Sequence, residues 1–388
     1  MSKQYQICSR CVFDTSDPDI TFDDQGVCNW CTRYDNELSK LWLKGEAGKA
    51  RLDEWVKEIK EYGKDKEYDC ILGLSGGIDS SYLAYLGTKL GLRMLAVHVD
   101  AGWNSELAVQ NIQNICSKLK IDLITEVVDW SVMRKVQLAF FRSGMVNQDV
   151  PQDHAFFAAL YNYARKNKIK YVLNGYNIAT ENSLPLTWRG EYAMDDIFVR
   201  SVYKRYYKKS LKNFPLLNYW NFNLTNFFRK EYVIVDLLNC FDFSKEEALK
   251  TLAEEVDYKD YGGKHNESRF TKFHQNYFLV RKHGFEKRRA HIASLVISGL
   301  LVREKALGML SKPIYNNRQE EQEEVEYIAK KLGISEEEFH QIMAAPALTI
   351  DDFKSGQKMH KKLLPYLTSF FKTGSKVKQL FKSGRVKK

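Results

Sequence analysis

Length and charge narrow the classes to which this chain can belong. It has 388 residues, 44% of them hydrophobic, which is enough for a large buried core and for two or three domains. No segment approaches the roughly 20 apolar residues of a membrane-spanning helix. The first residues lack the apolar core of a signal peptide, so we expect a cytoplasmic protein. The net charge of +10 favours nucleotide, nucleotide-sugar or nucleic-acid partners without choosing among them.

Four of the seven cysteines occur as two closely spaced pairs near the N-terminus. Each pair has Cys-x-x-Cys spacing, which is typical of a zinc ribbon with tetrahedral coordination. The four residues are Cys8, Cys11, Cys28 and Cys31. Because disulfides are rare in cytosolic proteins, we expect a structural Zn²⁺ that stabilises a segment too small to fold alone. A redox or iron–sulfur role is the alternative, since thiolates bind those metals too.

A glycine-rich turn comes after the next two predicted elements. Helical spacing predicts a helix over 42–62, and an apolar strand over 69–74 leads into a Ser-Gly-Gly turn and a helix over 80–90. Backbone N–H groups of such a turn bind an anion together with the helix dipole, and glycine allows close approach. Asp79 fits a phosphate site if a divalent cation lies between its carboxylate and the phosphates. We therefore expect a pyrophosphate-binding loop, with an ordinary capped strand–turn–helix as the alternative.

Strand and helix patterns alternate through the next part of the chain. The spacing predicts strands over 95–100, 122–128 and 171–175, and helices over 107–119 and 156–166. Near-continuous apolar strands that alternate with helices predict an α/β fold with a doubly wound parallel sheet. Such sheets bind ligands at the carboxyl ends of their strands, where the Ser-Gly-Gly turn, Asp100 and Gly175 fall.

The last third of the sequence has a mainly helical pattern. Ser244 and Ser335 each begin a capping-box sequence. We predict three regions, which are a zinc ribbon over 1–40, an α/β domain over 41–245 and a helical C-terminal region over 246–388. The basic end, 372–388, contains no acidic residue and is expected to be a solvated tail, with a membrane or RNA contact as the alternative.

The segment Ser75-Gly76-Gly77-Ile78-Asp79-Ser80-Ser81 resembles the SGGxDS[ST] signature of the PP-loop ATP pyrophosphatases. These enzymes cleave ATP to AMP and pyrophosphate and adenylylate a carbonyl oxygen. The turn is not a Walker A loop, because no Gly-Lys-Ser/Thr follows the glycines. The resemblance implies a PP-loop fold, ATP and Mg²⁺ as cofactors, and a catalytic role for Asp79. The ATP contacts that we expect are Ser75, Gly76, Gly77, Asp79, Ser80, Ser81, His98, Val99, Asp100 and Gly175. At 98–100 the alternative is a plain turn at the end of a strand.

A second ligand for magnesium is suggested by the segment after residue 171. Glu181 follows Gly175 by six positions, which is similar to the NAD synthetase segment whose glutamate ligates magnesium. On that resemblance, Asp79 and Glu181 hold Mg²⁺, which would offset the charge on departing pyrophosphate. A helix-capping glutamate is the alternative.

Two further stretches are rich in polar side chains. Asp153 and His154 precede the predicted helix 156–166, where we weigh substrate binding against a simple Asp N-cap. Residues 261–273 combine a Gly-Gly turn with a cation, a carboxylate and spaced aromatics, which suits a loop that folds over phosphates or a sugar. A solvated basic loop is the alternative there. Within this stretch we expect Lys264 to be catalytic and His265, Glu267 and Ser268 to contact substrate.

With these segments the resemblance narrows to one family and runs from Cys8 to about Tyr315. The cysteine pairs, 98–104, 261–273 and 282–291 look like the N-acetyl sugar amidotransferase family, WbpG/PseA-like, of surface-polysaccharide pathways. In that family ATP adenylylates the acetamido oxygen of a UDP-activated N-acetyl sugar, and ammonia displaces AMP to leave an acetamidino group. The resemblance implies lipopolysaccharide O-antigen biosynthesis and makes Arg288 a substrate contact.

The source of ammonia must lie outside this chain on that interpretation. No cysteine stands in a glutaminase context, since Cys70 and Cys240 lie in apolar settings and Cys116 on a helix. The family implies partners like the glutaminase (HisH-like) and cyclase (HisF-like) subunits of imidazole glycerol phosphate synthase. The main alternative is a PP-loop tRNA thiolase, which the net charge favours but the lack of paired cysteines near the loop disfavours. A non-catalytic nucleotide-binding protein is a second alternative, against which Asp79 and Glu181 argue.

Overall fold

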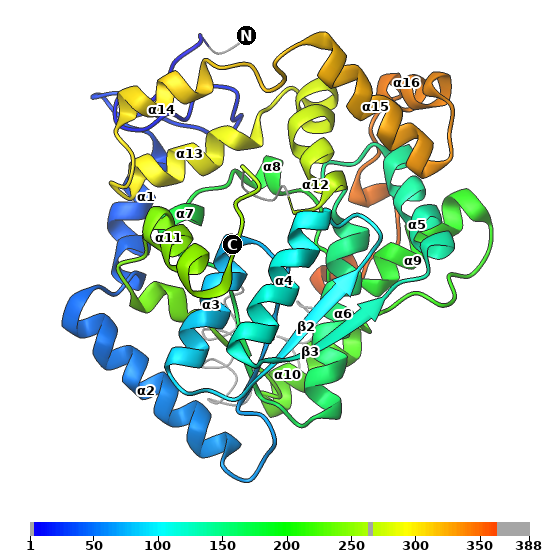
Figure 1. Cartoon of the computed structure of the whole chain (residues 1–388). Coiled ribbons are helices and arrows are strands. Elements are labelled where there is room, and N and C mark those ends of the chain that lie inside the picture. The colour runs from blue at the N-terminus through cyan, green and yellow to red at the C-terminus, as the bar shows by residue number, and fades with distance from the viewer. Residues whose placement is uncertain (1–3, 263–266, 363–388) are drawn as a thin grey trace.

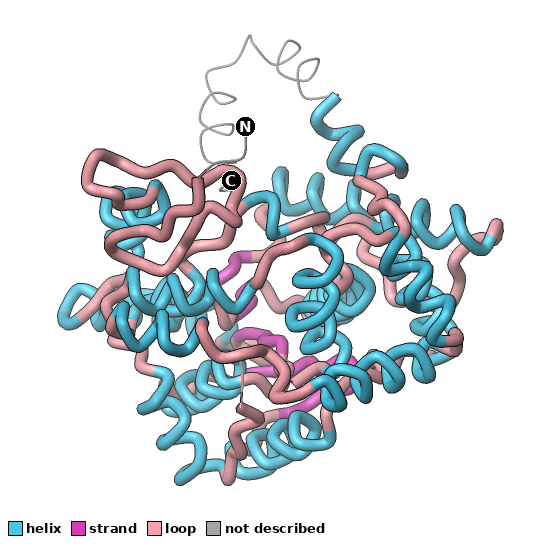
Figure 2. The backbone as a smooth tube through the Cα atoms, turned by 90° about the horizontal axis from the view of Figure 1, so that it is seen from above, coloured by secondary structure: helices cyan, strands magenta, loops and turns pink. Residues whose placement is uncertain are grey.

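A five-stranded parallel sheet forms the centre of the molecule (Figure 1). The computed structural model describes residues 4–262 and 267–362. The strand order is β3-β2-β1-β4-β5, and every neighbouring pair is parallel. Seen from above, the strands lie within a surround of helices and loops (Figure 2). The strands are β1 Cys70–Gly73, β2 Met94–Asp100, β3 Asp122–Val127, β4 Tyr171–Leu173 and β5 Val233–Val235.

Most of the remaining chain is helical. The α-helices are α1 Asn29–Arg33, α2 Gly45–Gly63, α3 Ile78–Lys89, α4 Glu106–Leu119, α5 Trp130–Ser143, α6 Val150–Lys166, α7 Ile178–Glu181, α8 Leu186–Arg189, α9 Asp196–Tyr207, α10 Tyr219–Arg229, α11 Lys245–Val256, α12 Arg269–Phe273, α13 Lys287–Ile297, α14 Arg303–Leu310, α15 Arg318–Leu332 and α16 Glu336–Ala344. Two π-helical segments are η1 Tyr34–Leu38 and η4 His274–His283, and the 3₁₀ turns are η2 Ser39–Leu41, η3 Leu237–Cys240 and η5 Ile350–Asp352.

The direction in which the chain crosses from one strand to the next determines which helices cover each face of the sheet. The chain moves outward from β1 to β3 and then returns to β4 on the other side of β1. Because parallel crossovers are right-handed, α3 and α4 lie on one face and α6 on the other. β1 and β2 are buried nearly throughout, as expected for strands that are covered on both sides. Gly73 pairs with Val97 and Leu72 with Leu173, so the carboxyl ends of the central strands meet at one edge.

Two sets of hydrogen bonds hold the C-terminal helices over that edge. The Ser105 N–H donates to the Glu267 carbonyl at 2.8 Å, and the Arg269 N–H donates to the Trp103 carbonyl at 2.8 Å. The Asn182 amide, directly after α7, donates to the Ser294 carbonyl of α13 at 2.9 Å. The segment after β2 and the segment after β4 are therefore both tied to the C-terminal region.

The doubly wound sheet and the order of its predicted elements are confirmed. The predicted helix at 156–166 begins earlier, at Val150, with Pro151 in the first turn, where its missing N–H is tolerated. The N-cap interpretation of Asp153 is therefore wrong, because that residue lies inside the first turn of α6. Ser244 and Ser335 do cap α11 and α16, accepting from the N–H groups of residues 247 and 338.

Several elements of the α/β part were not predicted, among them α5, α9, α10 and β5. In α5 the run Val136–Phe141 is wholly buried, so the second half of the helix interrupts the alternation of apolar and polar positions. β5 is three residues long, too short for an alternating pattern. The predicted domain boundaries stay predictions, and the basic tail lies outside the described residues.

Over 4–262 and 267–362, we find no helix that combines the length and the apolar character needed to cross a membrane.

Candidate functional site

The Ser-Gly-Gly turn joins β1 to α3 and is shaped by its own hydrogen bonds. The Ser75 and Ser80 hydroxyls lie 3.1 Å apart, and the Gly77 N–H donates to Ser75 Oγ at 3.2 Å. Gly76 has φ +82°, and a Cβ there would lie 2.7 Å from the Ala108 carbonyl oxygen. A side chain at Gly76 would therefore be strained by its backbone and obstructed by α4. Tyr258 closes the turn from outside by donating to the Gly76 carbonyl at 3.1 Å.

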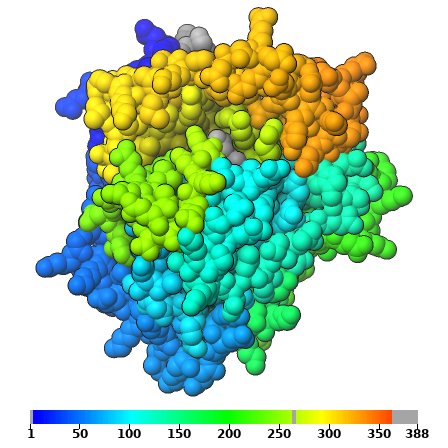
Figure 3. Space-filling view, in the orientation of Figure 1, coloured from blue at the N-terminus to red at the C-terminus, as the bar shows by residue number. Residues whose placement is uncertain are grey.

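The turn opens into a cavity of about 1020 Å³ at the carboxyl ends of the strands. The face shown in Figure 3 is hollowed between the yellow and orange C-terminal helices and the green and cyan elements below them. The walls of the cavity come from the Ser-Gly-Gly turn, the ends of β2 and β4, and helices α6, α12 and α13. The predicted site residues that line it are Ser75, Gly77, Asp79, Ser80, His98, Val99, Asp153, Gly175, Glu181, Glu267, Ser268 and Arg288.

Four other predicted site residues do not line the cavity. Gly76 and Ser81 shape the turn from behind, and the Ser81 side chain is fully buried. Asp100 accepts from the Gly102 N–H at 2.8 Å and so stabilises the turn after β2. His154 is fully buried, with its Nδ1 2.6 Å from the Ala193 carbonyl and its Nε2 accepting from the Leu217 N–H at 3.1 Å. Because the backbone occupies both of its ring nitrogens, His154 joins segments of the core instead of reaching toward a substrate.

His98 combines a buried position with a place on the cavity wall. Its Nδ1 lies 3.0 Å from the Leu74 carbonyl, which can only accept, so this nitrogen carries the proton. Its Nε2 lies 3.1 Å from the Asn104 side-chain amide and is left as an acceptor. Burial lowers the pKa of His98, partly offset by the Leu74 contact and by Asp100. This neutral ring positions the end of β1 beside the end of β2.

Asp79 and Glu181 approach the cavity from two different strand-end loops. Asp79 lies in the first turn of α3, and its Oδ1 accepts from the Asn177 amide at 3.0 Å. Glu181 ends α7, whose N-cap is the same Asn177. Gly175 lies against the Asp79–Ser80 backbone, with 3.5 Å between its ideal Cβ position and the Ser80 nitrogen. Two carboxylates with room for phosphate oxygens suit Mg²⁺, which protein sites hold through one or two carboxylates plus substrate.

The stretch 261–273 reaches the loop from the C-terminal side. An ideal Cβ on Gly77 would lie 3.1 Å from Glu267 Oε1 and 3.2 Å from the Tyr261 hydroxyl, so both side chains adjoin the turn. Burial, followed by the charge of Glu267, raises the pKa of Tyr261, so the phenol stays neutral. Ser268 caps α12 and also donates to Gln152 Oε1 at 2.9 Å. Lys264 and His265 lie outside the described residues, and their assigned roles stay predictions.

Arg288 lines the cavity from α13 and is held by fixed partners. Its Nε donates to the Glu286 carboxylate, and its Nη2 donates to the Lys312 carbonyl at 2.9 Å. These contacts orient the guanidinium without neutralising the whole wall, because Lys272 and Lys287 also line the cavity. A basic wall of this kind fits a substrate that carries phosphate or carboxylate groups.

Six further cavity residues were not among the individual site predictions, although all but the first of them lie in stretches that the sequence analysis noted. They are Asp149, Gln152, Tyr261, Lys272, Lys287 and His291. Lys287 comes more than a hundred positions after Asp149, and only the folded chain brings the two side chains to one cavity. The polar density at 150–154 pointed to the right segment. The family resemblance pointed to 282–291, at the start of α13, but singled out Arg288 alone there.

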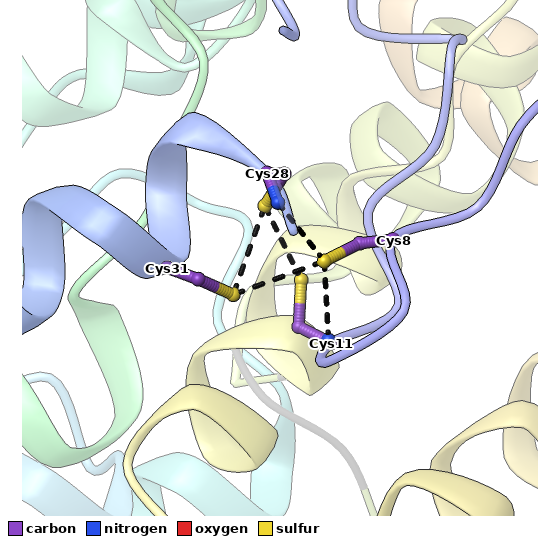
Figure 4. A group of neighbouring side chains, drawn as sticks. All are labelled: Cys8, Cys11, Cys28 and Cys31. Atoms are coloured by element: carbon purple, nitrogen blue, oxygen red, sulfur yellow. Dashed lines mark hydrogen bonds between the residues drawn. The ribbon is translucent and has the colours of Figure 1, made fainter. Parts of the chain in front are cut away.

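The four paired cysteines converge on one point (Figure 4). All four are buried, and their sulfurs lie within 4.8 Å of one another. The Cys11–Cys28 and Cys28–Cys31 sulfur distances are 3.6 and 3.7 Å. Tetrahedral Zn–S bonds of about 2.3 Å place sulfurs roughly 3.8 Å apart, so the cluster has the dimensions of a zinc site. Among the described residues it is the one group of three or more potential ligands that could hold a metal.

Two arginines fasten this cysteine cluster to the C-terminal helices, which lie beside the N-terminal segment in Figure 1. Arg303 of α14 donates to the Cys8 carbonyl at 2.8 Å and to the Cys11 carbonyl at 2.9 Å. Arg289 of α13 donates to the Val12 carbonyl at 2.8 Å. The cluster is therefore attached to the helix that carries Lys287 and Arg288.

The three remaining cysteines are buried and do not line the cavity. Burial raises the pKa of Cys70 and raises that of Cys116 to about 11. The pKa of Cys240 is also raised by burial. Thiols of this kind stay protonated and are poor nucleophiles, so none of them is placed to carry sulfur.

Comparison with known proteins identifies two regions. Residues 50–215 match the NAD synthase family model, and residues 267–366 match the model described as the C-terminal domain of LPS biosynthesis proteins that are WbpG-like. An uncharacterized protein of Methanocaldococcus jannaschii, MJ1599, is 25% identical over 316 residues, covering 79% of this chain and 93% of that protein. A glutamine-hydrolyzing GMP synthase of Mesoplasma florum is 48% identical over 52 residues, 13% of this chain and 10% of that enzyme. NMN synthetase from Francisella tularensis has 16% identity and a TM-score of 0.36, covering 79% of this chain and 99% of that structure.

Proposed function

Because this chain is a WbpG-like amidotransferase of the PP-loop type, we propose that it converts the N-acetyl group of a nucleotide-activated sugar to an acetamidino group. ATP activates the amide oxygen as an adenylate, and ammonia then displaces AMP. The proposed pathway is lipopolysaccharide O-antigen biosynthesis. The supporting observation is one cavity that joins an ATP-type loop to a wall of basic residues from the WbpG-like region.

The loop supplies the part of the site that takes ATP. Its N–H groups and the start of α3 would hold the pyrophosphate, because they present hydrogen-bond donors and a positive dipole end. Asp79 and Glu181 would hold Mg²⁺, which when bound neutralises charge on the departing pyrophosphate. Ser75 and Ser80 keep the turn in shape through their mutual hydrogen bond. An amide is a poor electrophile, so adenylylation before ammonia addition is chemically required.

The opposite wall would take the sugar nucleotide. Asp153, Glu267, Ser268 and Arg288 are the proposed substrate contacts within the described residues, and His154 is withdrawn from that set because it faces the core. Lys272 and Lys287 add positive charge for a diphosphate or a uronic carboxylate. The cysteine cluster would bind Zn²⁺ as a structural ion, because four thiolates leave no open coordination position.

The ammonia is proposed to come from a separate glutaminase with a channel-forming subunit. The three cysteines outside the cluster are buried and protonated, so none of them suits glutamine hydrolysis. The same observation disfavours the tRNA thiolase alternative, which needs accessible thiolates near the loop.

The test is a coupled measurement with ATP·Mg²⁺, ammonium salt and a panel of UDP-N-acetyl sugars. AMP and pyrophosphate release should accompany the small mass decrease of exchanging oxygen for NH on one sugar. AMP release with unmodified tRNA and with no sugar would replace the proposal by the thiolase alternative.

A further inference from the structure

A group of charged side chains lines the cavity next to the Ser-Gly-Gly turn, 75–81, which is called the ATP loop because ATP is proposed to bind there. Asp149 immediately precedes α6, Asp153 lies one turn into that helix, and Lys287 begins α13. One turn beyond Asp153, the Phe156 ring lies against Gly73 at the end of β1. Asp153 thus lies about one helical turn, roughly 5 Å along α6, from the residue whose ring contacts the strand that leads into the ATP loop.

The two aspartates have different surroundings, and Asp149 is fully engaged. It accepts from the Thr271 hydroxyl at 3.0 Å and from the Gln152 amide at 3.3 Å, and it contacts His274 Nδ1 at 3.0 Å. The other ring nitrogen of His274 donates to the Val146 carbonyl, 2.8 Å away, so both ring nitrogens have fixed partners. Burial alone would raise the pKa of Asp149, but His274, Lys287 and Thr271 lower it. Asp149 therefore stays charged.

Asp153 keeps its carboxylate available to the cavity. Among the described residues, none donates a hydrogen bond to its side chain, and the residue is only half-buried. Burial and the neighbouring charge of Asp149 raise the pKa of Asp153 to about 7, with Lys287 acting in the opposite direction. Lys272 and Arg288 also line this cavity. A carboxyl group that titrates near neutral pH in a reaction cavity is suited to accept and return a proton.

We propose that Asp153 is the proton acceptor for the acetamido nitrogen while ATP activates the amide oxygen. This inference rests on the proposed function and adds a catalytic residue to it. Asp149, held by His274, acts as a positioning residue that fixes the start of α6 and the local charge. Lys287 restrains the basicity of Asp153, so that the carboxylate is present at neutral pH.

The proton balance of both steps follows from this assignment. In the first step the amide oxygen bonds to the α-phosphorus, the bond to pyrophosphate breaks, and the N–H proton moves to Asp153. In the second, Asp153 returns that proton to the imidate nitrogen, and ammonia adds to the carbon. The carboxylate then takes one proton from the added nitrogen, and the C–O bond to AMP breaks. The amidinium product leaves, and the proton on Asp153 exchanges with water.

The experiment compares Asp153→Asn with Asp122→Asn. The control removes a carboxylate at the amino end of β3, outside the cavity lining. We expect Asp153→Asn to lose roughly 10²–10⁴-fold in kcat/KM, the usual contribution of a general base. In the wild type the rate should fall as the pH drops below about 7, and this acid limb should be absent from the residual activity of the variant. Thermal unfolding and ATP·Mg²⁺ binding should match the wild type in both variants.

Lys287→Met provides a second test that does not remove the carboxylate. Because Lys287 lowers the pKa of Asp153, this variant should move the acid limb to higher pH. An unmoved limb, or an Asp153→Asn enzyme that changes only KM and keeps the limb, would overturn the assignment. If the wild type amidinates no N-acetyl sugar, the proposed function itself is wrong and the inference falls with it.

Discussion

The ATP loop and the cysteine cluster use opposite means to bind what they hold. The loop offers mainly backbone N–H groups and faces a cavity of about 1020 Å³, so that substrates can enter and products can leave. The cluster offers four buried side-chain sulfurs that converge on one another, and backbone N–H groups of the same segment donate to two of them. An open site made by the backbone suits turnover, and a closed site made by side chains suits a resident ion. The comparison teaches that the proposed structural metal and the proposed nucleotide chemistry, with its Mg²⁺, belong to two different parts of this chain.

The largest expected effect is a loss of enzymatic activity from a change in the loop that leaves the cysteine cluster intact. Asp79→Asn removes a proposed magnesium ligand from the loop, and we expect a loss of about 10²–10³-fold in AMP release, as for other lost electrostatic stabilisers. Zinc content and thermal unfolding should stay at wild-type values. Asp122→Asn serves as the matched carboxylate control. Equal rates in Asp79→Asn and wild type would remove the proposed metal role of Asp79.

The converse change tests the cysteine cluster. Cys31→Ser should reduce bound zinc below one ion per chain, by metal analysis, and lower the unfolding temperature, because a structural zinc site contributes directly to folding. ATP·Mg²⁺ binding by the folded fraction should persist, since the loop is shaped by its own hydrogen bonds. Cys116→Ala is the control for a buried cysteine outside the cluster. Full zinc content in Cys31→Ser would contradict the four-thiolate site.

A smaller effect is expected at the contact between the cluster and the C-terminal helices. Arg303→Met removes the hydrogen bonds to the Cys8 and Cys11 carbonyls, at a cost of about 1.5–3 kcal/mol in the free energy of unfolding. Zinc content should remain unchanged, because no sulfur is altered. The exposed Lys305→Met on the same helix should change stability by less than about 0.5 kcal/mol. A loss of zinc in Arg303→Met would show that the arginine maintains the site itself.

The smallest expected effect is on the pH dependence of the free energy of unfolding, to which buried histidines contribute. Burial lowers the pKa of His154, of His98 and of His283, so the unfolded chain binds more protons than the folded one. The free energy of unfolding should therefore fall as the pH drops below about 6.5, the ordinary histidine value, and keep falling toward the lower folded-state pKa values. His154→Gln should flatten this slope in denaturant titrations, whereas the exposed His340→Gln should not. An unchanged slope in His154→Gln would mean that this ring does not titrate in that range.

The sequence predicts those features of the fold that local patterns determine. The alternation of strands and helices, the turn after β1 and the spacing of the cysteine pairs each depend on neighbouring residues, and the structure places them as expected. The start of α6 was predicted six residues too late, because the polar segment that was expected to precede the helix forms its first turn, with Pro151.

The candidate site was harder to predict because its walls come from distant segments. Asp153 and His154 are adjacent in the sequence, yet one lines the cavity and the other bonds to the core backbone. The direction of a side chain on a helix depends on where the helix begins, which the pattern placed too late. Lys287 lay in the segment 282–291 of the family resemblance but was not singled out, since its importance comes from the aspartates that the fold brings near it.

The most direct test of the central claim follows the acetamido oxygen. The accepted UDP-N-acetyl sugar, labelled in its acetamido group with a heavy oxygen isotope, is incubated with ATP·Mg²⁺ and ammonium, and the AMP is analysed by mass spectrometry. Adenylylation of the amide oxygen predicts that the label leaves the sugar and appears in AMP, in equal amount to the amidine formed. Unlabelled AMP, with the label retained on the sugar, would contradict the proposed reaction.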